Sequence, residues 1–234
     1  MSYLPVLNDK HYDYKNRVKK VNFDSSKIYT FNKKGNLIIC LIEFRLVEEI
    51  KHVLAALLKI YKPEDIGVAI MHGNKNKEYI ETTFKNWKNL ILIHKNFNNI
   101  DRRVYSALLK QPEYYEHFKN WENVLIYQTD ALIMRKIDDI YFNYDYIGAP
   151  WTECNQWCKY PAGNGGFSLR KIKSCIKVCE QFRGVKFSTI PTGNEDGFFC
   201  SQDKFNYPPY NTELHKAFSV ERVKYNHPIG CHQI

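Results

Sequence analysis

Val124-Leu125-Ile126-Tyr127-Gln128-Thr129-Asp130 is the stretch that decides the fold of this chain. Its apolar half is typical of a strand buried in a sheet, and the strand gives way to an amide and a carboxylate two positions apart. Because side chains alternate along a strand, we expect Gln128 and Asp130 to point the same way at its carboxyl end. Open α/β sheets bind their ligands at that end.

An amide oxygen next to a carboxylate suits a hard divalent cation such as Mg²⁺ or Mn²⁺, and such a cation can hold a diphosphate. The alternative for Gln128 and Asp130 is an ordinary solvated strand end. The motifs elsewhere in the chain distinguish a metal site from a solvated strand end.

Around this strand, apolar runs of strand length alternate with segments of helical periodicity. Such alternation predicts an α/β domain with a mostly parallel, Rossmann-like sheet flanked by helices. Residues 1–35 form a polar lead-in, and residues 36–234 form the predicted domain, whose C-terminal half is less regular. The predicted strands are 37–44, 67–71, 90–94, 124–130 and 146–148, and the predicted helices are 47–61, 76–87, 100–109, 112–121 and 171–183.

Length and composition fit a globular protein of 234 residues with one main domain. The net charge of +9 comes from lysines spread along the chain, without a nucleic-acid-binding motif, so we expect no nucleic acid partner. A positive field also suits an anionic small molecule. No apolar run approaches the roughly 20 residues that span a bilayer, and no signal peptide is evident, so a cytoplasmic protein is expected. The oligomeric state is not readable.

The seven cysteines are an odd number, which favours reduced thiols. Cys154 and Cys158 are four positions apart, as are Cys175 and Cys179, and two such pairs allow a zinc site. Cys175 and Cys179 fall in a helical pattern, however, where this spacing favours one buried face.

The second motif is Gly163-Asn164-Gly165-Gly166-Phe167-Ser168-Leu169-Arg170. Its glycines allow close approach of the backbone to a ligand or a positive φ, and a hairpin turn or bulge is the alternative. The order of elements excludes both a Walker A loop and a dinucleotide fingerprint.

Two further motifs carry ionisable groups. Glu195 and Asp196 are adjacent carboxylates at the start of a helix-like segment, where one of them could act as a general base. Favourable interaction with the helix dipole is the alternative. His232 follows a Pro/Gly turn near the chain end and is an acceptable third ligand for Mn²⁺ beside a carboxylate.

In this order the motifs resemble a family of glycosyltransferase-like proteins with a GT-A fold, members of which occur in large DNA viruses. The resemblance runs from about Leu37 to His232. It rests on IEFR, HGN, YQTDALI, YDYIGAPW, GNGGFSLRK, EDGFF, AFSVE and PIGCH.

The resemblance implies a metal site. Gln128-Thr129-Asp130 would stand for the Asp-x-Asp signature of nucleotide-sugar glycosyltransferases, with Gln128 replacing the first carboxylate. Asp130 would then be a metal ligand, and His232 would correspond to the late histidine that completes the metal shell in some GT-A enzymes. In the acidic pair, the second residue, Asp196, would be the stronger base candidate beside Glu195.

The resemblance also implies a donor site. Glu43 and Arg45 would close the first strand where the nucleoside is held, with Arg45 near phosphate. His72-Gly73-Asn74 would lie beside the base and ribose. Trp151, Gly165 and Gly166 would line the donor sugar or the acceptor, and Trp151 as a core aromatic is the alternative.

These residues predict a Mn²⁺- or Mg²⁺-dependent glycosyltransferase that uses a nucleotide sugar, most commonly UDP-linked in this fold, and a glycan or protein acceptor. Transfer with inversion would follow if Asp196 is the base. Two rivals remain: a GT-A scaffold that has lost catalysis and binds nucleotide sugars or glycans, and a nucleotidyltransferase.

Overall fold

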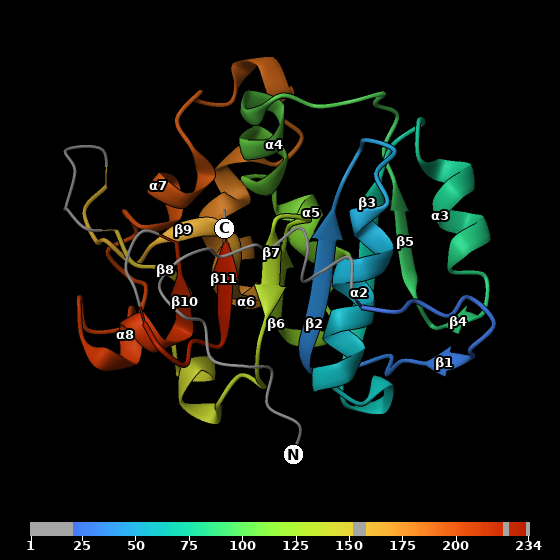
Figure 1. Cartoon of the computed structure of the whole chain (residues 1–234). Coiled ribbons are helices and arrows are strands. Elements are labelled where there is room, and N and C mark those ends of the chain that lie inside the picture. Colours follow the sequence, from blue (N-terminus) through green and yellow to red (C-terminus); the bar gives the residue numbers. More distant parts are fainter. Residues whose placement is uncertain (1–20, 152–157, 222–224, 233–234) are drawn as a thin grey trace.

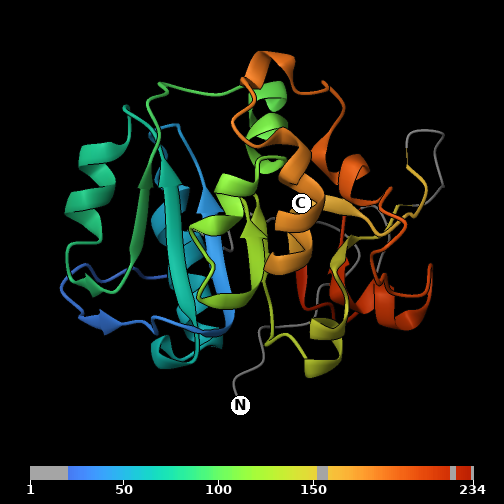
Figure 2. The ribbon, with the colours of Figure 1, turned by 180° about the vertical axis from the view of Figure 1, so that it is seen from behind.

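A six-stranded sheet runs through the centre of the molecule, and helices cover both of its faces (Figures 1 and 2). The computed structural model describes residues 21–151, 158–221 and 225–232. The strand order is β5-β3-β2-β6-β9-β8. The first four of these strands are parallel, whereas β9 runs antiparallel to both β6 and β8. The predicted mostly parallel α/β sheet is therefore confirmed.

The elements of the central sheet and its helices follow one another in βα order until β6. The strands are β2 (Gly35–Ile42), β3 (Gly67–His72), β5 (Ile91–His94), β6 (Trp121–Tyr127), β8 (Tyr146–Ala149) and β9 (Asn164–Lys171). The helices are α2 (Glu49–Ile60), α3 (Lys77–Thr83), α4 (Arg102–Leu109), α5 (Pro112–Glu116), α6 (Ile172–Cys179), α7 (Glu195–Phe199) and α8 (Glu213–Phe218). Short 3₁₀ turns cover residues 63–65, 139–143, 180–182 and 187–189.

Alternate residues of β2 enter the two halves of the core. Leu37, Ile39 and Leu41 pack with α2 on one face, whereas Ile38, Cys40 and Ile42 pack with α4, α5 and α6 on the other. Burial on both faces explains why this strand reads as a continuous apolar run. Cys175 and Cys179 both lie buried in α6, as the helical interpretation predicted, and Cys154 lies outside the described residues.

A second, three-stranded sheet in the order β10-β11-β7 lies beside the first. It contains β7 (Ala131–Ile133), β10 (Ser219–Val220) and β11 (Gly230–His232). The antiparallel pairing of β11 with β7 sets His232 opposite Ala131. The end of the chain is thereby brought to the residues that follow β6 (Figure 1).

Two predicted helices end before a tryptophan that was predicted to belong to them. The helix predicted to reach residue 87 ends at Thr83, and Trp87 instead forms β4 (Trp87–Lys88), which pairs with β1 (Tyr29–Thr30). The helix predicted to reach residue 121 ends at Glu116, because Trp121 opens β6 opposite Gly35. In both places a tryptophan gains more from burial against a sheet than from continuing a helix.

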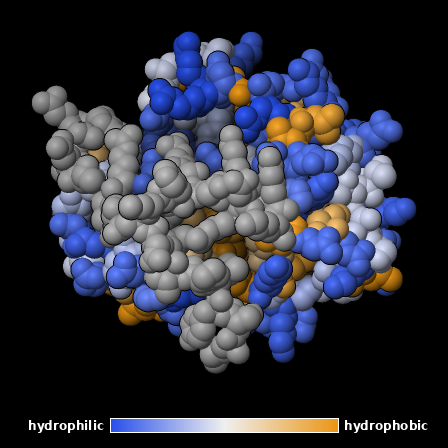
Figure 3. All heavy atoms as spheres, viewed as in Figure 1, coloured by the Kyte–Doolittle hydropathy of each residue, from blue (hydrophilic) through white to orange (hydrophobic). Residues whose placement is uncertain are grey.

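The N-terminal part that the structure describes contributes to the core. Val21 and Phe31 are buried in the same core half as α2. The domain boundary at residue 35 stays a prediction. Hydrophilic residues make up much of the described surface in Figure 3, with apolar groups between them. Within the described residues, no helix has the length and apolar character to cross a membrane.

Candidate functional site

A cavity of about 780 Å³ opens where β2 and β6 end, beside the start of β9 and of α7. This is the edge at which parallel sheets hold their ligands. Residues from β2, α4, the β6–β7 turn, β9, α7 and β11 share its wall. The lining residues are Ile42, Glu43, Phe44, Arg45, Val47, Glu49, Asn99, Ile100, Asp101, Arg102, Tyr105, Gln128, Thr129, Asp130, Asn164, Gly165, Gly166, Asn194, Glu195, Asp196 and His232.

Glu43 is a buried carboxylate that organises the end of β2. Its Oε1 accepts hydrogen bonds from the backbone N–H of Arg45 and from Arg45 Nε, each at 2.9 Å, and its Oε2 accepts from Arg45 Nη2 at 2.7 Å. Thr129 Oγ1 donates to the same Oε2 at 3.0 Å. Burial raises the pKa of Glu43, but the hydrogen bonds and charge of Arg45 outweigh it and hold that pKa below its usual value. The bidentate pair fixes the Arg45 guanidinium at the cavity wall, although its side chain is 60% exposed.

His232, Asp130 and Gln128 converge at the end of β6. His232 Nε2 lies 3.0 Å from Gln128 Oε1 and 3.4 Å from Asp130 Oδ1. Burial lowers the pKa of His232, but the carboxylates of Asp130 and Glu221 outweigh it and raise that pKa to about 9. Burial likewise raises the pKa of Asp130, yet His232 and Arg45 hold it below its usual value. The amide oxygen of Gln128, the carboxylate of Asp130 and a ring nitrogen of His232 thus lie close together in the cavity.

The two consecutive glycines of the GNGG motif make room for these side chains. They lie inside β9, not in a loop, and neither has a positive φ. A Cβ at Gly166 would overlap the imidazole of His232, and one at Gly165 would overlap Oε1 of Glu195. The predicted close approach at this motif is therefore an approach of side chains from β11 and α7.

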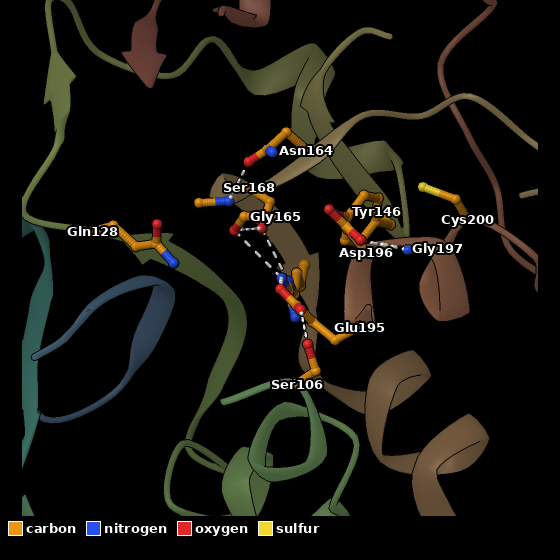
Figure 4. A network of polar contacts seen from close by, with 12 residues as sticks. Ser106, Gln128, Tyr146, Asn164, Gly165, Ser168, Glu195, Asp196, Gly197 and Cys200 are labelled. Carbon is orange, nitrogen blue, oxygen red and sulfur yellow. Dashed lines mark hydrogen bonds and ion pairs between the residues drawn. The ribbon is translucent and has the colours of Figure 1, made fainter. Parts of the chain in front are cut away.

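Glu195, which lines the cavity, is anchored from two sides. Ser106 Oγ on α4 donates to its Oε2 at 2.9 Å, as the dashed line in Figure 4 marks. Arg170 Nη2 on β9 lies 3.4 Å from its Oε1, and both side chains are almost fully buried.

Asp196 has a different environment. It is buried, and its Oδ1 accepts a hydrogen bond from the backbone N–H of Gly197 at 2.7 Å (Figure 4). Burial, followed by the charge of Glu195, raises the pKa of Asp196 to about 7. A carboxyl group with that pKa suits general acid–base chemistry near neutral pH.

Most of the residues singled out in the sequence meet at this cavity, but four do not line it. His72 is buried at the end of β3, with its ring centroid 5.4 Å from that of His94. The backbone N–H of Gly73 donates to the side chain of Asn76, which in turn donates to the carbonyl of Glu43 at 2.7 Å. Asn74 bonds to other side chains outside the cavity, and Trp151 packs against the core half of α4 to α6.

Sequence reasoning missed the contribution of α4. Tyr105 and Arg102 line the cavity, Ser106 reaches Glu195, and Lys110 Nζ donates to the carbonyls of Pro191 and Gly193 just before α7. Nothing in the amphipathic pattern of this helix marks these roles. Arg170 had a signal, since it is a charged residue inside a strand that is otherwise buried.

The side chains around Asp130 include groups that could hold a cation. Among the described residues there is no cluster of three or more His, Cys, Asp or Glu side chains placed to bind a metal ion. Asp130 and His232 could provide two ligands, with the amide oxygen of Gln128 beside them, once a cation displaces the proton that the raised pKa of His232 keeps on its ring. Mg²⁺ is typically bound through one or two carboxylates together with substrate phosphates, so two protein ligands suffice.

The fold is similar to that of a solved glycosyltransferase structure. An active-site mutant of LgtC superimposes with a TM-score of 0.54 at 12% identity, over 83% of this chain and 86% of that chain. The glycosyltransferase GlyE of Streptococcus pneumoniae TIGR4 gives a TM-score of 0.44 at 11% identity, over 71% of this chain and 43% of that chain. The mannosyltransferase PcManGT of Pyrobaculum calidifontis, solved with GDP-Man and Mn²⁺, gives 0.38 at 13% identity, over 68% and 51%. The predicted GT-A-like fold is confirmed.

The sequence profile of one family matches residues 86–232, which is most of the chain. The chain belongs to the DUF5672 family. That family is described as "Protein of unknown function (DUF5672)". No curated protein matches this DUF5672 sequence. The matched range contains Gln128, Asp130, the GNGG motif, Glu195, Asp196 and His232, and leaves out Glu43 and Arg45.

Proposed function

We propose that this DUF5672 protein is a metal-dependent glycosyltransferase that moves a sugar from a nucleotide-sugar donor to a hydroxyl of a glycan or protein acceptor. One observation carries the proposal. Asp130 and His232, which could bind a cation, line the same cavity as Asp196, a carboxyl group suited to act as a base.

The part of the cavity around Arg45 and Asp130 would bind the diphosphate of the nucleotide sugar. The Arg45 guanidinium, fixed by Glu43, offers hydrogen bonds to phosphate oxygens. Asp130, His232 and the Gln128 amide would hold a Mn²⁺ or Mg²⁺ ion, which when bound would neutralise charge on the departing nucleoside diphosphate. UDP is our first choice of nucleotide.

Asp196 would take the proton from the acceptor hydroxyl as its oxygen forms a bond to the anomeric carbon. The bond from that carbon to the diphosphate oxygen breaks, and the nucleoside diphosphate leaves with the electron pair. Orientation of both substrates by the cavity wall supplies the rest of the acceleration. A single displacement of this kind inverts the anomeric centre.

Gln128 favours a second candidate function. Its amide stands where a first carboxylate would strengthen metal binding, so a scaffold that binds a nucleotide sugar without transferring it also fits. The presence of an anchored acidic pair in the same cavity favours the enzyme.

Product analysis separates these functions. Purified protein is incubated with Mn²⁺ and a panel of UDP- and GDP-sugars, and the release of nucleoside diphosphate and free or transferred sugar is followed. Diphosphate release that needs Asp196 supports the proposal. Binding of a nucleotide sugar without turnover favours the binding scaffold, and release of pyrophosphate from nucleoside triphosphates would instead indicate nucleotidyl transfer.

A further inference from the structure

The two carboxylates of the acidic pair have different surroundings. Glu195 Oε2 accepts a hydrogen bond from Ser106 Oγ at 2.9 Å. Its other oxygen, Oε1, lies 3.4 Å from Arg170 Nη2. Asp196 receives the N–H of its neighbour Gly197, and among the described residues no side chain donates a hydrogen bond to it. The first carboxylate is fixed in place by side chains, whereas the second is bonded by backbone N–H groups, those of Gly197 and Gly165.

One anchor of Glu195, the Arg170 guanidinium, is itself held by several side chains. Arg170 is fully buried and is held by Ser168 Oγ and Tyr115 Oη, each at 3.0 Å. Its guanidinium also lies 5.2 Å from the ring centre of Tyr146 and 5.0 Å from that of Phe199. A Cβ at Gly165 would overlap Oε1 of Glu195, so this position also has to be a glycine.

A second contact joins the C-terminal end of α4 to the segment before α7. It lies one helical turn from the contact made by Ser106. Lys110 is the C-cap of α4, four residues after Ser106, so the two side chains lie on the same side of the helix. Ser106 bonds to Glu195, and Lys110 Nζ bonds to the carbonyls of Pro191 and Gly193. The backbone that carries the acidic pair is thus fastened to α4 on both sides of Asn194.

We propose that Glu195 is a positioning residue whose fixed negative charge makes its neighbour Asp196 the group that exchanges a proton in the cavity. The Ser106 hydroxyl and the Arg170 guanidinium fix this carboxylate in place, and a carboxylate beside a second carboxyl group makes that group hold its proton more tightly. The catalytic meaning of this inference rests on the proposed function, but the electrostatic relationship does not.

The other charged and titratable groups around the pair do not reverse this effect. The Arg170 cation lowers the pKa of Asp196, and it does so less than burial and Glu195 raise it. Lys110 on α4 is another nearby cation, and it is engaged with backbone carbonyls. Tyr146 on β8 and Cys200 after α7 are buried, and burial raises the pKa of each, so both stay neutral.

The direct test is the titration of Asp196 in the protein without substrate. Carboxyl carbons of aspartate are labelled with ¹³C, and the Asp196 signal is assigned by its loss in Asp196→Asn. We expect Glu195→Gln, which removes the charge and keeps the shape, to lower the midpoint of Asp196 by about one pH unit or more. An unchanged midpoint in Glu195→Gln would overturn the proposal.

Ser106→Ala is the second variant, in case Glu195→Gln does not fold. Loss of the hydroxyl lets the Glu195 carboxylate move away from Asp196, so the Asp196 midpoint should fall by a smaller amount. Ser201→Ala is the matched control, because Ser201 Oγ donates to the backbone carbonyl of Gly197 and contacts neither carboxylate. Equal midpoints in wild type, Ser106→Ala and Ser201→Ala would also overturn the proposal.

Turnover separates this inference from the proposed function. With UDP- or GDP-sugars as probes, the acid limb of the kcat/KM profile should move to lower pH in Glu195→Gln, in step with the NMR midpoint. If wild type releases no nucleotide from any probe, the proposed function fails, and the NMR titration still decides the role of Glu195.

Discussion

The imidazole of His232 lies directly over the α-carbon of Gly166, in the space that a β-carbon would occupy. The two residues belong to β11 and β9, strands of different sheets. Contact between them sets the position of His232 against Asp130 and Gln128. The absence of a side chain at residue 166 is therefore a requirement of the candidate metal site.

Gly166→Ala should displace His232 from Asp130. We expect a weaker Mn²⁺ affinity by roughly tenfold to a hundredfold, as happens when the orientation of a metal ligand is lost. Isothermal titration calorimetry with Mn²⁺ in the presence of UDP would measure it. Gly193→Ala is the control, because a Cβ there meets nothing within 4 Å. Equal Mn²⁺ affinity in both variants would show that His232 does not bind the metal.

Arg45→Ala should weaken nucleotide binding. A charge-assisted hydrogen bond to phosphate contributes about 1.5–3 kcal/mol, so the Kd for UDP should rise by about one to two orders of magnitude. Arg183→Ala is the matched control, because Arg183 pairs with Glu116 and Glu180 away from the cavity. Titration of each variant with UDP and Mn²⁺ tests the assignment, which fails if the two arginine variants bind equally well.

We expect stability and kcat/KM to change with pH as Asp196 ionises. Its pKa of about 7 lies above the usual 3.8. Because the folded protein holds this proton more tightly than the unfolded chain, the stability that Asp196 contributes is full below the unfolded pKa and is lost as the pH rises through about 7. As a base, Asp196 must be ionised, so kcat/KM should rise with pH up to about 7 and then level off.

Two comparisons check this behaviour. Relative to Asp196→Asn, wild type should lose unfolding free energy between about pH 4 and pH 7 in urea titrations. In Asp196→Asn the base is absent, so any remaining rate of nucleotide release should no longer fall as the pH is lowered. An acid limb with a midpoint near 4 would show that Asp196 titrates as an ordinary carboxyl group.

Arg170→Met should destabilise the fold through Glu195. Removing one partner of a buried ion pair leaves an uncompensated charge, which costs about 3–5 kcal/mol. The double variant Arg170→Met/Glu195→Gln should recover part of that loss, because no buried charge remains unpaired. Urea unfolding of the two single variants and the double variant gives the coupling energy, and strictly additive losses would contradict the pairing.

The sheet could be predicted because its buried strands appear in the sequence as uninterrupted apolar runs. The run from Leu37 to Ile42 is apolar at every position, as a strand buried on two faces must be. Trp87 and Trp121 misled the prediction, because both also fit the periodicity of the helix before them. Their burial against sheet residues, which decides the matter, depends on contacts distant in the sequence.

The candidate site could be predicted only as far as its motifs reach. Asp130, Glu195 and His232 were identified as ionisable groups in suggestive places, and the structure brings all three to one cavity. The antiparallel pairing of β11 with β7 that places His232 is a long-range contact with no local signal. Ser106 and Lys110 escaped notice for the same reason, since their partners lie more than 80 residues away along the chain.

The most direct test of the central claim compares wild type with Asp130→Ala in a thermal-shift titration of UDP- and GDP-sugars, each with and without Mn²⁺. A ligand that binds only the folded state raises its stability by RT ln(1 + [L]/Kd). We predict that at least one nucleotide sugar raises the Tm of wild type only when Mn²⁺ is present, and that Asp130→Ala abolishes the rise. An equal rise in Asp130→Ala, or one that needs no metal, would contradict the account.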